Sequence, residues 1–165
     1  MNTDMSEDSL HPSSLDRLDR RILCALQANG RISNQELAST VHLSPAQCNR
    51  RHRRLERLGY VKRYEARLDA DRLGLGVTAF VHITMERGQF KEVLKFQRTI
   101  ERMPEILECH AVTGDFDYVC KVVASDLKSL SNFLLGTLAQ LPGVNGVRSS
   151  ICLNELKCTS ALPLA

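Results

Sequence analysis

Apolar residues follow a helical period in the first third of the chain and a strand period in much of the rest. A first helix is predicted between Asp16, which can cap its start, and the Asn29-Gly30 pair, which ends it. Ser33 and Glu36 form a capping box that opens a second, shorter helix. The inward positions of these two helices are predicted to be Leu18, Ile22, Leu23, Leu26, Leu37, Ala38 and Val41.

A third helix is predicted within residues 43–60. Ser44 and Gln47 form a second capping box, Pro45 takes the first helical position, and Gly59 ends the helix. The connection to the preceding helix has helix-turn-helix length, so residues 15–64 predict a three-helix domain whose third helix is the reader. Its inward seam is predicted to contain Cys48, His52 and Leu55, with Arg51 and Leu58 on one shoulder.

The opposite side of the third helix is cationic. Seven Lys and Arg residues lie between Ser44 and Tyr64, against the single acid Glu56. A basic run is often only a solvated face, but a helix charged for solubility would more often alternate opposite signs at i,i+4. The pattern therefore favours binding in a DNA major groove. The outer arc consists of Ala46, Arg50, Arg53 and Arg57, flanked by Asn49 and Arg54.

The positive charge is local. Residues 15–64 hold 11 Lys and Arg against 4 Asp and Glu, whereas residues 77–165 hold 9 of each. The excess behind the formal net charge of +3 therefore belongs to the helical domain.

Residues 60–69 alternate moderately and predict a short strand, the wing of a winged helix, with Lys62 and Arg63 placed against phosphate. Residues 69–73 are expected to make one helical turn, and Gly74-Leu75-Gly76 interrupts the pattern. We expect a linker over 65–76.

The second half, residues 77–165, predicts an α+β domain with β-α-β-β-α-β order, the ferredoxin-like arrangement. Strands are expected over 77–85, 106–114, 117–125 and from 144 onward, with one helix over 90–103 and another from Asp126 to the Pro142-Gly143 stop. Both strand faces carry apolar residues. The face that the helices leave bare predicts a homodimer.

The remaining features exclude several classes of protein. No apolar run approaches the roughly 20 residues of a membrane span, and the acidic, polar start is unlike a signal peptide, so we expect a cytoplasmic protein with a mobile arm over residues 1–14. The six cysteines form no C-x-x-C pair, so we expect reduced, packed thiols and no metal site. No catalytic motif is present, which indicates a non-enzyme.

Three segments in this order, LDRLDRRILCALQANGRISNQELA, LSPAQCNRRHRRLERLGYV and VTGDFDYVCKV, resemble the Lrp/AsnC family of bacterial transcription regulators, the feast/famine regulatory proteins. The resemblance runs from about Leu15 to the C-terminus. It implies an N-terminal winged helix-turn-helix that binds double-stranded DNA. It also implies a C-terminal domain that forms dimers and higher assemblies, often octamers, and binds small effectors, commonly amino acids, with no cofactor.

By position, the resemblance places the reading helix at residues 45–58. Arg50 and Arg53 are predicted to contact guanine edges or nearby phosphates and Asn49 an adenine edge, because these side chains can present bidentate pairs. The full predicted DNA-binding set is Ser44, Ala46, Gln47, Asn49, Arg50, Arg53, Arg54, Arg57, Lys62 and Arg63.

The effector is expected near the turn that contains Gly114. A bound zwitterion needs a carboxylate for its ammonium group and N–H groups for its carboxylate, which the acids and backbone of this turn can supply. A polar hairpin corner is the alternative interpretation. The predicted effector set is Gly114, Asp115, Asp117, Tyr118, Ser149 and Ser150.

Two positions depart from the family pattern. Cys48 and His52 stand where aliphatic residues are usual; we expect a core histidine with one hydrogen-bond partner, while a redox or pH sensor is the alternative. Two other functions stay open. Tetrapyrrole (siroheme-type) decarboxylases resemble this family in fold and would use histidines such as His82 and His110, and a ligand-sensing scaffold would act through protein partners.

Overall fold

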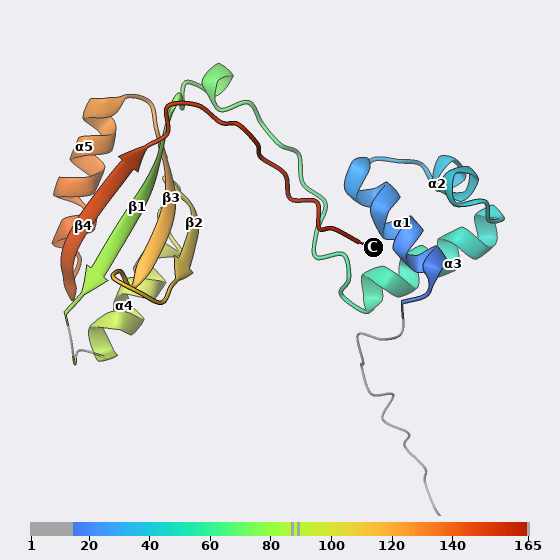
Figure 1. Cartoon of the computed structure of the whole chain (residues 1–165), viewed down its shortest axis with the longest axis horizontal. Coiled ribbons are helices and arrows are strands. Elements are labelled where there is room, and N and C mark those ends of the chain that lie inside the picture. Colours follow the sequence, from blue (N-terminus) through green and yellow to red (C-terminus); the bar gives the residue numbers. More distant parts are fainter. Residues whose placement is uncertain (1–14, 87, 89, 165) are drawn as a thin grey trace, which may run out of the picture. The chain divides into compact units, whose positions relative to one another are not determined.

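The structure, a computed structural model, describes residues 15–86, 88 and 90–164. Within this range the chain forms two compact units, one of residues 15–67 with 158–164 and the other of residues 68–157 (Figure 1). The predicted arm over 1–14 lies outside the described residues. The expected second domain ran to residue 165, whereas residues 158–164 belong to the first unit.

The C-terminal segment is held by α1 (Arg17–Ala28). The Leu162 backbone N–H donates to Gln27 Oε1 at 2.6 Å, and Gln27 Nε2 donates to the Leu162 carbonyl at 3.1 Å. Leu164 packs against the apolar core of the helical unit. The side-chain amide of Gln27 both donates to and accepts from the backbone of one residue, as a neighbouring strand would. A pattern of apolar positions does not predict such a contact.

The helical unit has the predicted three helices. After α1 come α2 (Asn34–Val41) and α3 (Pro45–Arg57). Capping boxes begin α2 and α3 at Ser33 and Ser44 as expected, and the expected cap Asp16 forms one at α1 as well. Their apolar sides meet in one core, which confirms the predicted periodicity except at Leu18, which is only half-buried while Asp19 beside it is fully buried. The buried apolar residues are Ile22, Leu23, Leu26, Leu37, Ala38, Val41, Cys48 and Leu55.

Two left-handed residues end α2 and α3. Gly59 has φ 77° and closes α3 through backbone bonds from Gly59 N to Glu56 O and from Tyr60 N to Leu55 O. His42 takes the corresponding place after α2 with φ 58°. It is a strained choice for a residue with a Cβ, and it forms the sharp corner that turns the chain into α3.

The predicted wing strand is wrong. Residues 60–69, all of them described, form no strand. The segment instead folds back on α3, where the Tyr64 hydroxyl donates to Glu56 Oε1 at 3.0 Å and lies 2.7 Å from His52 Nε2. A strand needs backbone pairing with a neighbouring segment, and residues 60–69 form no such ladder with any described part of the helical unit.

The second unit has the predicted order of elements. Its strands are β1 (Val77–Met85), β2 (Ile106–Ala111), β3 (Tyr118–Ala124) and β4 (Val144–Ile151), and they form an antiparallel sheet in the order β2-β3-β1-β4. The helices are α4 (Phe90–Ile100) and α5 (Leu127–Gly136). This arrangement confirms the ferredoxin-like α+β prediction.

Two short 3-10 turns complete the unit. Asp71–Leu73 is the turn expected in the linker. The second, Leu138–Gln140, corrects the end of α5, which was expected to continue to Pro142. Thr137 leaves the helical region with φ −121°, and this break lets Leu138 turn into the core, where it is fully buried.

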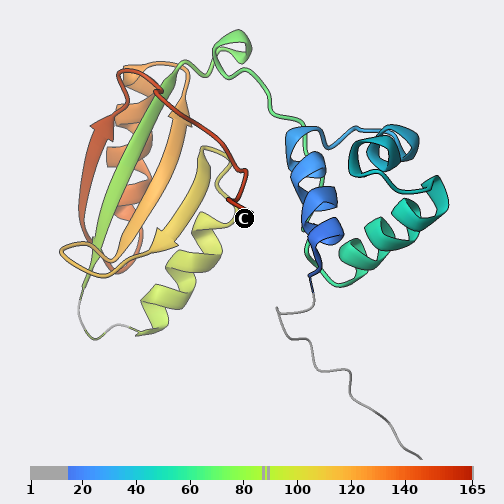
Figure 2. The same cartoon turned by 45° about the vertical axis from the view of Figure 1, so that its right-hand side comes forward.

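Both helices cover one face of the sheet (Figures 1 and 2). Ala79, Val81 and Ile83 of β1 point into the core with Phe96 of α4 and Leu134 of α5. The alternate β1 positions face the other way, so that Phe80 is 44% exposed and His82 is half-buried. This helix-free face bears the second hollow described below.

Candidate nucleic-acid interface and ligand hollow

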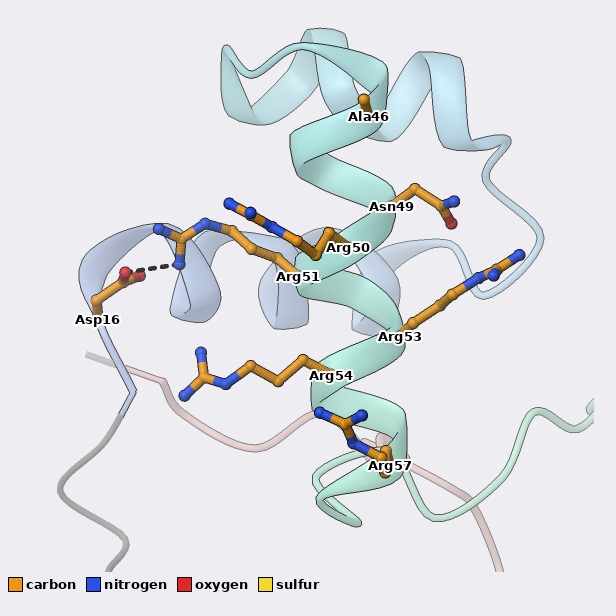
Figure 3. A pocket seen from close by; sticks show the side chains of 8 residues that line it. All are labelled: Asp16, Ala46, Asn49, Arg50, Arg51, Arg53, Arg54 and Arg57. Atoms are coloured by element: carbon orange, nitrogen blue, oxygen red, sulfur yellow. Dashed lines mark hydrogen bonds and ion pairs between the residues drawn. The ribbon is translucent and has the colours of Figure 1, made fainter. Parts of the chain in front are cut away.

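The exposed side of α3 borders a hollow of roughly 830 Å³. Six of its lining residues, five arginines and one asparagine, come from successive turns of α3. The lining residues are Asp16, Ala46, Asn49, Arg50, Arg51, Arg53, Arg54 and Arg57 (Figure 3).

A buried carboxylate anchors the inner edge of this surface. Asp19 of α1 has 0% exposure, and its two oxygens accept from Arg51 NH1 at 2.8 Å and Arg54 NH1 at 3.1 Å. Arg51 NH1 also lies 2.6 Å from Asp16 Oδ2. Two helices that otherwise meet through apolar contacts are thereby fixed by charge-assisted hydrogen bonds, which define the rotation of α3 about its axis.

The hydrogen bonds of this cluster also shift the pKa values of Asp16 and Arg51. The Asp19 carboxylate, followed by that of Asp16, accepts from the Arg51 guanidinium and raises the pKa of Arg51. The Asp19 backbone N–H is the largest cause that lowers the pKa of Asp16, and the Arg51 contact adds to it against the effect of burial. Both shifts favour the charged forms of Asp16 and Arg51.

The outer part of the surface is free to face a ligand. Arg50, Arg53 and Arg57 are exposed and Asn49 is half-exposed. In Figure 3, Asn49 and Arg53 project to one side of α3, whereas Arg50, Arg51 and Arg54 project to the other. The structure thus divides the arginines of one helix into an anchoring pair and an outward group.

Other predicted DNA-binding residues have local partners. The Gln47 and Ser44 side chains bond each other at 3.0 Å in the capping box. Arg63 Nε lies 2.6 Å from Glu65 Oε2, and Lys62 is exposed in the same segment. Because Ser44 and Gln47 bond each other, they have less capacity for base contact than the sequence alone suggested.

Cys48 and His52, the two residues of α3 that depart from the family pattern, have structural contacts. Cys48 is fully buried, and burial raises the pKa of its thiol, which makes it a poor nucleophile. His52 is half-buried and not in the core, with Tyr64 as its partner. Because the Tyr64 proton goes to Glu56, His52 Nε2 is the donor to the phenol oxygen. Burial, then the Glu56 contact, raises the pKa of Tyr64 to about 12.

A second hollow, of roughly 400 Å³, lies on the helix-free face of the sheet. The Phe116 ring lies 4.7 Å from the His82 ring, and the Arg148 guanidinium carbon lies 5.8 Å from the Phe116 centroid. The hollow thus combines an aromatic wall, a guanidinium and a carboxylate. Its lining residues are His82, Thr84, Asp115, Phe116, Gly146 and Arg148.

The predicted effector residues do not converge on this hollow. Asp115 lines it, and Gly114 (φ 122°) shapes the adjoining turn. Asp117 accepts from the Met85 N–H at 2.7 Å, and Tyr118 is buried beside Phe96 with its hydroxyl accepting from Gln97. These two residues hold the turn in place rather than face a ligand.

The predicted serines of β4 also lie apart. Ser149 pairs with Val81 and Ser150 with Phe80, so they occupy opposite faces, and neither lines the hollow. Arg148 and Phe116, which do line it, were missed because one residue is a lone cation and the other sits inside a polar turn. Asp19 was missed as well; the available signal was an acid on the inward side of α1 opposite a helix rich in arginine.

No helix within the described residues is long and apolar enough to cross a membrane. The same part of the chain contains no cluster of three or more His, Cys, Asp or Glu residues placed to hold a metal ion. The two hollows are the candidate binding sites.

Comparison with known proteins identifies both halves. Residues 15–62 match a winged helix-turn-helix DNA-binding family, and residues 78–162 match the Lrp/AsnC ligand binding domain. The chain is 43% identical over 148 residues to the leucine-responsive regulatory proteins of Escherichia coli K12 and Salmonella typhimurium, covering 90% of each chain.

Solved structures agree with these matches. A transcriptional regulator from Neisseria meningitidis in complex with L-methionine is 38% identical, with a TM-score of 0.89 over 92% of this chain and 97% of that one. An AsnC family regulator from Agrobacterium tumefaciens is 32% identical, with a TM-score of 0.85 over 91% and 97%. The chain therefore belongs to the Lrp/AsnC family of DNA-binding transcriptional regulators with an effector-binding domain.

Proposed function

We propose that this regulator reads its operator with the outward group of α3, Asn49, Arg50 and Arg53, while Arg57, Lys62 and Arg63 contact phosphate. The observation that carries the proposal is the division of the arginines: Asp19 holds Arg51 and Arg54 inward, so the remaining cations face outward in a fixed orientation. Arginine and asparagine present bidentate hydrogen bonds to guanine and adenine edges. Arg54, 36% exposed, combines its contact to Asp19 with a position next to the backbone of bound DNA.

Promoter-DNA binding across a salt series tests this assignment. Arg50→Ala and Arg53→Ala should each weaken specific binding by about 1–3 kcal/mol, roughly 5- to 150-fold, and Arg57→Ala should reduce the salt slope by about one. Arg98→Ala, an exposed arginine of α4 in the other unit, is the matched control and should leave binding unchanged. Affinity that neither falls with salt nor responds to the α3 variants would refute the proposal.

The effector is proposed to be an amino acid bound in the hollow of the second unit. Arg148 offers a guanidinium for an α-carboxylate, Asp115 a carboxylate for an α-ammonium, and the Phe116 ring an apolar wall for a side chain. The L-methionine complex of the Neisseria relative supports this ligand class. We propose that Gly114 shapes the site and that Asp117 and Tyr118 support it. Ser149 and Ser150 lie outside the hollow.

A thermal-shift screen against the twenty amino acids tests the effector proposal. A ligand that binds only the folded protein raises its melting temperature in proportion to RT ln(1 + [L]/Kd). Arg148→Ala should abolish the shift, while Arg98→Ala should retain it. If none of the twenty shifts the melting temperature, the effector proposal fails and the DNA assignment is unaffected.

Response to the effector is proposed to occur through assembly. The helix-free sheet face, with Phe80 largely exposed, is the surface for a homodimer, and dimers are proposed to associate further, up to an octamer. A ligand that binds one assembly better would alter the spacing of paired α3 helices and hence operator affinity. Light scattering with and without the stabilising amino acid measures this; an unchanged monomer would refute it.

The same observations favour a cytoplasmic regulator over a tetrapyrrole decarboxylase or a scaffold. The relatives are transcriptional regulators, and His82 stacks on Phe116 while His110 lies beside Glu108, so the two histidines have separate partners. Haem titration distinguishes the enzyme directly, because a Soret shift on binding would support it.

A further inference from the structure

Two cysteines face each other across neighbouring strands of the second unit. Cys109 of β2 is the register partner of Cys120 of β3, and their sulfur atoms lie 3.3 Å apart. Cys120 is fully buried in the sheet core, and Cys109 packs against the same core but is only half-buried. Neither residue belongs to the DNA-binding surface or to the ligand hollow.

The backbone at this pair suits a disulfide. The Val112 N–H donates to the Asp117 carbonyl at 3.0 Å, one of the two bonds of a hydrogen-bonded position in the antiparallel ladder, while the Asp117 N–H donates to Ile83 instead. Such pairs alternate with non-hydrogen-bonded ones, so the Cys109–Cys120 pair, three steps farther from the turn, is non-hydrogen-bonded. Cα atoms in these pairs are about 4.5 Å apart, within the roughly 4.4–6.8 Å range that disulfides span.

The two thiols differ in reactivity. The Cys120 S–H donates to Cys109, and this bond, with the smaller effect of His110 and against the effect of burial, lowers the pKa of Cys109 to about 7. The same bond, followed by burial, raises the pKa of Cys120. Cys109 is therefore the thiolate that reacts first, and β2 is an edge strand of the sheet, through which a small oxidant can reach it.

We propose that Cys109 and Cys120 form a dithiol that hydrogen peroxide oxidises to a cross-strand disulfide. The Cys109 thiolate attacks one peroxide oxygen; the O–O bond breaks, leaving a Cys109 sulfenic acid and hydroxide. The Cys120 sulfur then attacks the sulfenic sulfur, forming the S–S bond as the S–O bond breaks, and the Cys120 proton leaves with the hydroxyl group as water. The two sulfurs lose two electrons, and the peroxide gains them.

The product would join the two strands that lead into and out of the 112–117 turn. Asp115 and Phe116 of that turn line the ligand hollow, so oxidation fixes the two strands that carry this turn. The other cysteines provide internal comparisons. Cys24 and Cys158 are exposed, and Cys48 is fully buried with a raised pKa.

Peptide mapping of the full-length protein tests the proposal. Trypsin releases residues 103–121 as one peptide that contains Cys109 and Cys120 and no other cysteine. After peroxide treatment and alkylation, we expect this peptide to lack both alkyl groups and to have lost two hydrogens, and a reductant should restore it. If the peptide stays fully alkylated at peroxide doses that oxidise the exposed Cys158, the proposal is overturned, and no variant has to fold for this result.

Two variants test the order of the steps. In Cys120→Ser, whose hydroxyl keeps a hydrogen-bond donor at this position but cannot form a disulfide, Cys109 should accumulate as a sulfenic acid that dimedone labels, about tenfold more than Cys120 is labelled in Cys109→Ser. Equal labelling of the two positions would contradict the assigned nucleophile. Cys158→Ser is the matched control, and it should form the disulfide within peptide 103–121 as the wild type does.

Discussion

Different interactions orient the side chains of the binding surface in each of the two units. In the helical unit, a fully buried carboxylate, Asp19, holds Arg51 and Arg54 and so sets the direction in which the other arginines of α3 project. In the sheet unit, the hollow depends on ring contacts among His82, Phe116 and Arg148, which come from three separate segments. One surface is organised by ion pairs between adjacent helices, and the other by packing across strands.

This difference explains what each surface can recognise. An array of cations at helical spacing suits a regular polyanion, and its affinity depends on salt. A hollow of roughly 400 Å³ that combines one guanidinium, one carboxylate and an aromatic wall suits a small zwitterion. The comparison predicts that electrostatic substitutions affect the first unit most and that loss of a ring affects the second.

Asp19→Asn should have the largest effect. Loss of the carboxylate leaves two partly buried guanidinium groups without their shared acceptor, so the helical unit should lose about 3 kcal/mol of unfolding free energy. Asp16→Asn is the control, because asparagine caps a helix equally well and the Asp16 pair is exposed; its cost should stay under about 1 kcal/mol. Urea unfolding followed by circular dichroism measures both, and equal costs would break the contrast between anchored and exposed ion pairs.

Phe116→Ala should weaken binding of the amino acid that stabilises the wild type. Loss of the ring contacts with His82 and Arg148 should cost about 1.4 kcal/mol, roughly a tenfold rise in Kd. Isothermal titration measures the change. Leu135→Ala, at an exposed position of α5 outside the hollow, should leave the affinity unchanged; if both variants lose affinity equally, the hollow is not the binding site.

His42→Gly should stabilise the helical unit. Glycine removes the Cβ that strains the left-handed corner between α2 and α3, and we expect a gain of about 1 kcal/mol. His42→Ala keeps the Cβ and should bring no such gain. A thermal melt compares the two variants, and stabilisation by alanine equal to that by glycine would show that the imidazole, not the backbone, is the source of strain.

Asp126→Ser should have the smallest effect and only in acid. The Ser129 backbone N–H, chiefly, lowers the pKa of Asp126 below its usual 3.8. This cap therefore contributes stability above the unfolded pKa and loses it as pH falls through the folded pKa. Serine caps as well but does not titrate, so the wild type should lose melting temperature relative to the variant only below about pH 4. A difference in melting temperature that is the same at every pH would contradict this pH dependence.

Much of the fold was predictable because its signals are local. The capping boxes at Asp16, Ser33 and Ser44 bond residues three apart, and the apolar period of each element reports its buried face. The strand predicted at residues 60–69 was wrong because a strand depends on a pairing partner that the sequence does not specify. The end of α5 and the placement of residues 158–164 failed for the same reason, since both depend on contacts far along the chain.

The sequence by itself determined the elements, the cationic character of α3 and the family, because charge and periodicity are properties of short segments. Only the tertiary structure separated Arg51 and Arg54 from the outward arginines, brought Phe116 and Arg148 to one hollow, and placed Cys109 against Cys120. Each of these pairings joins residues from different elements. Their distances are set by how helices and strands pack, and no local pattern encodes that packing.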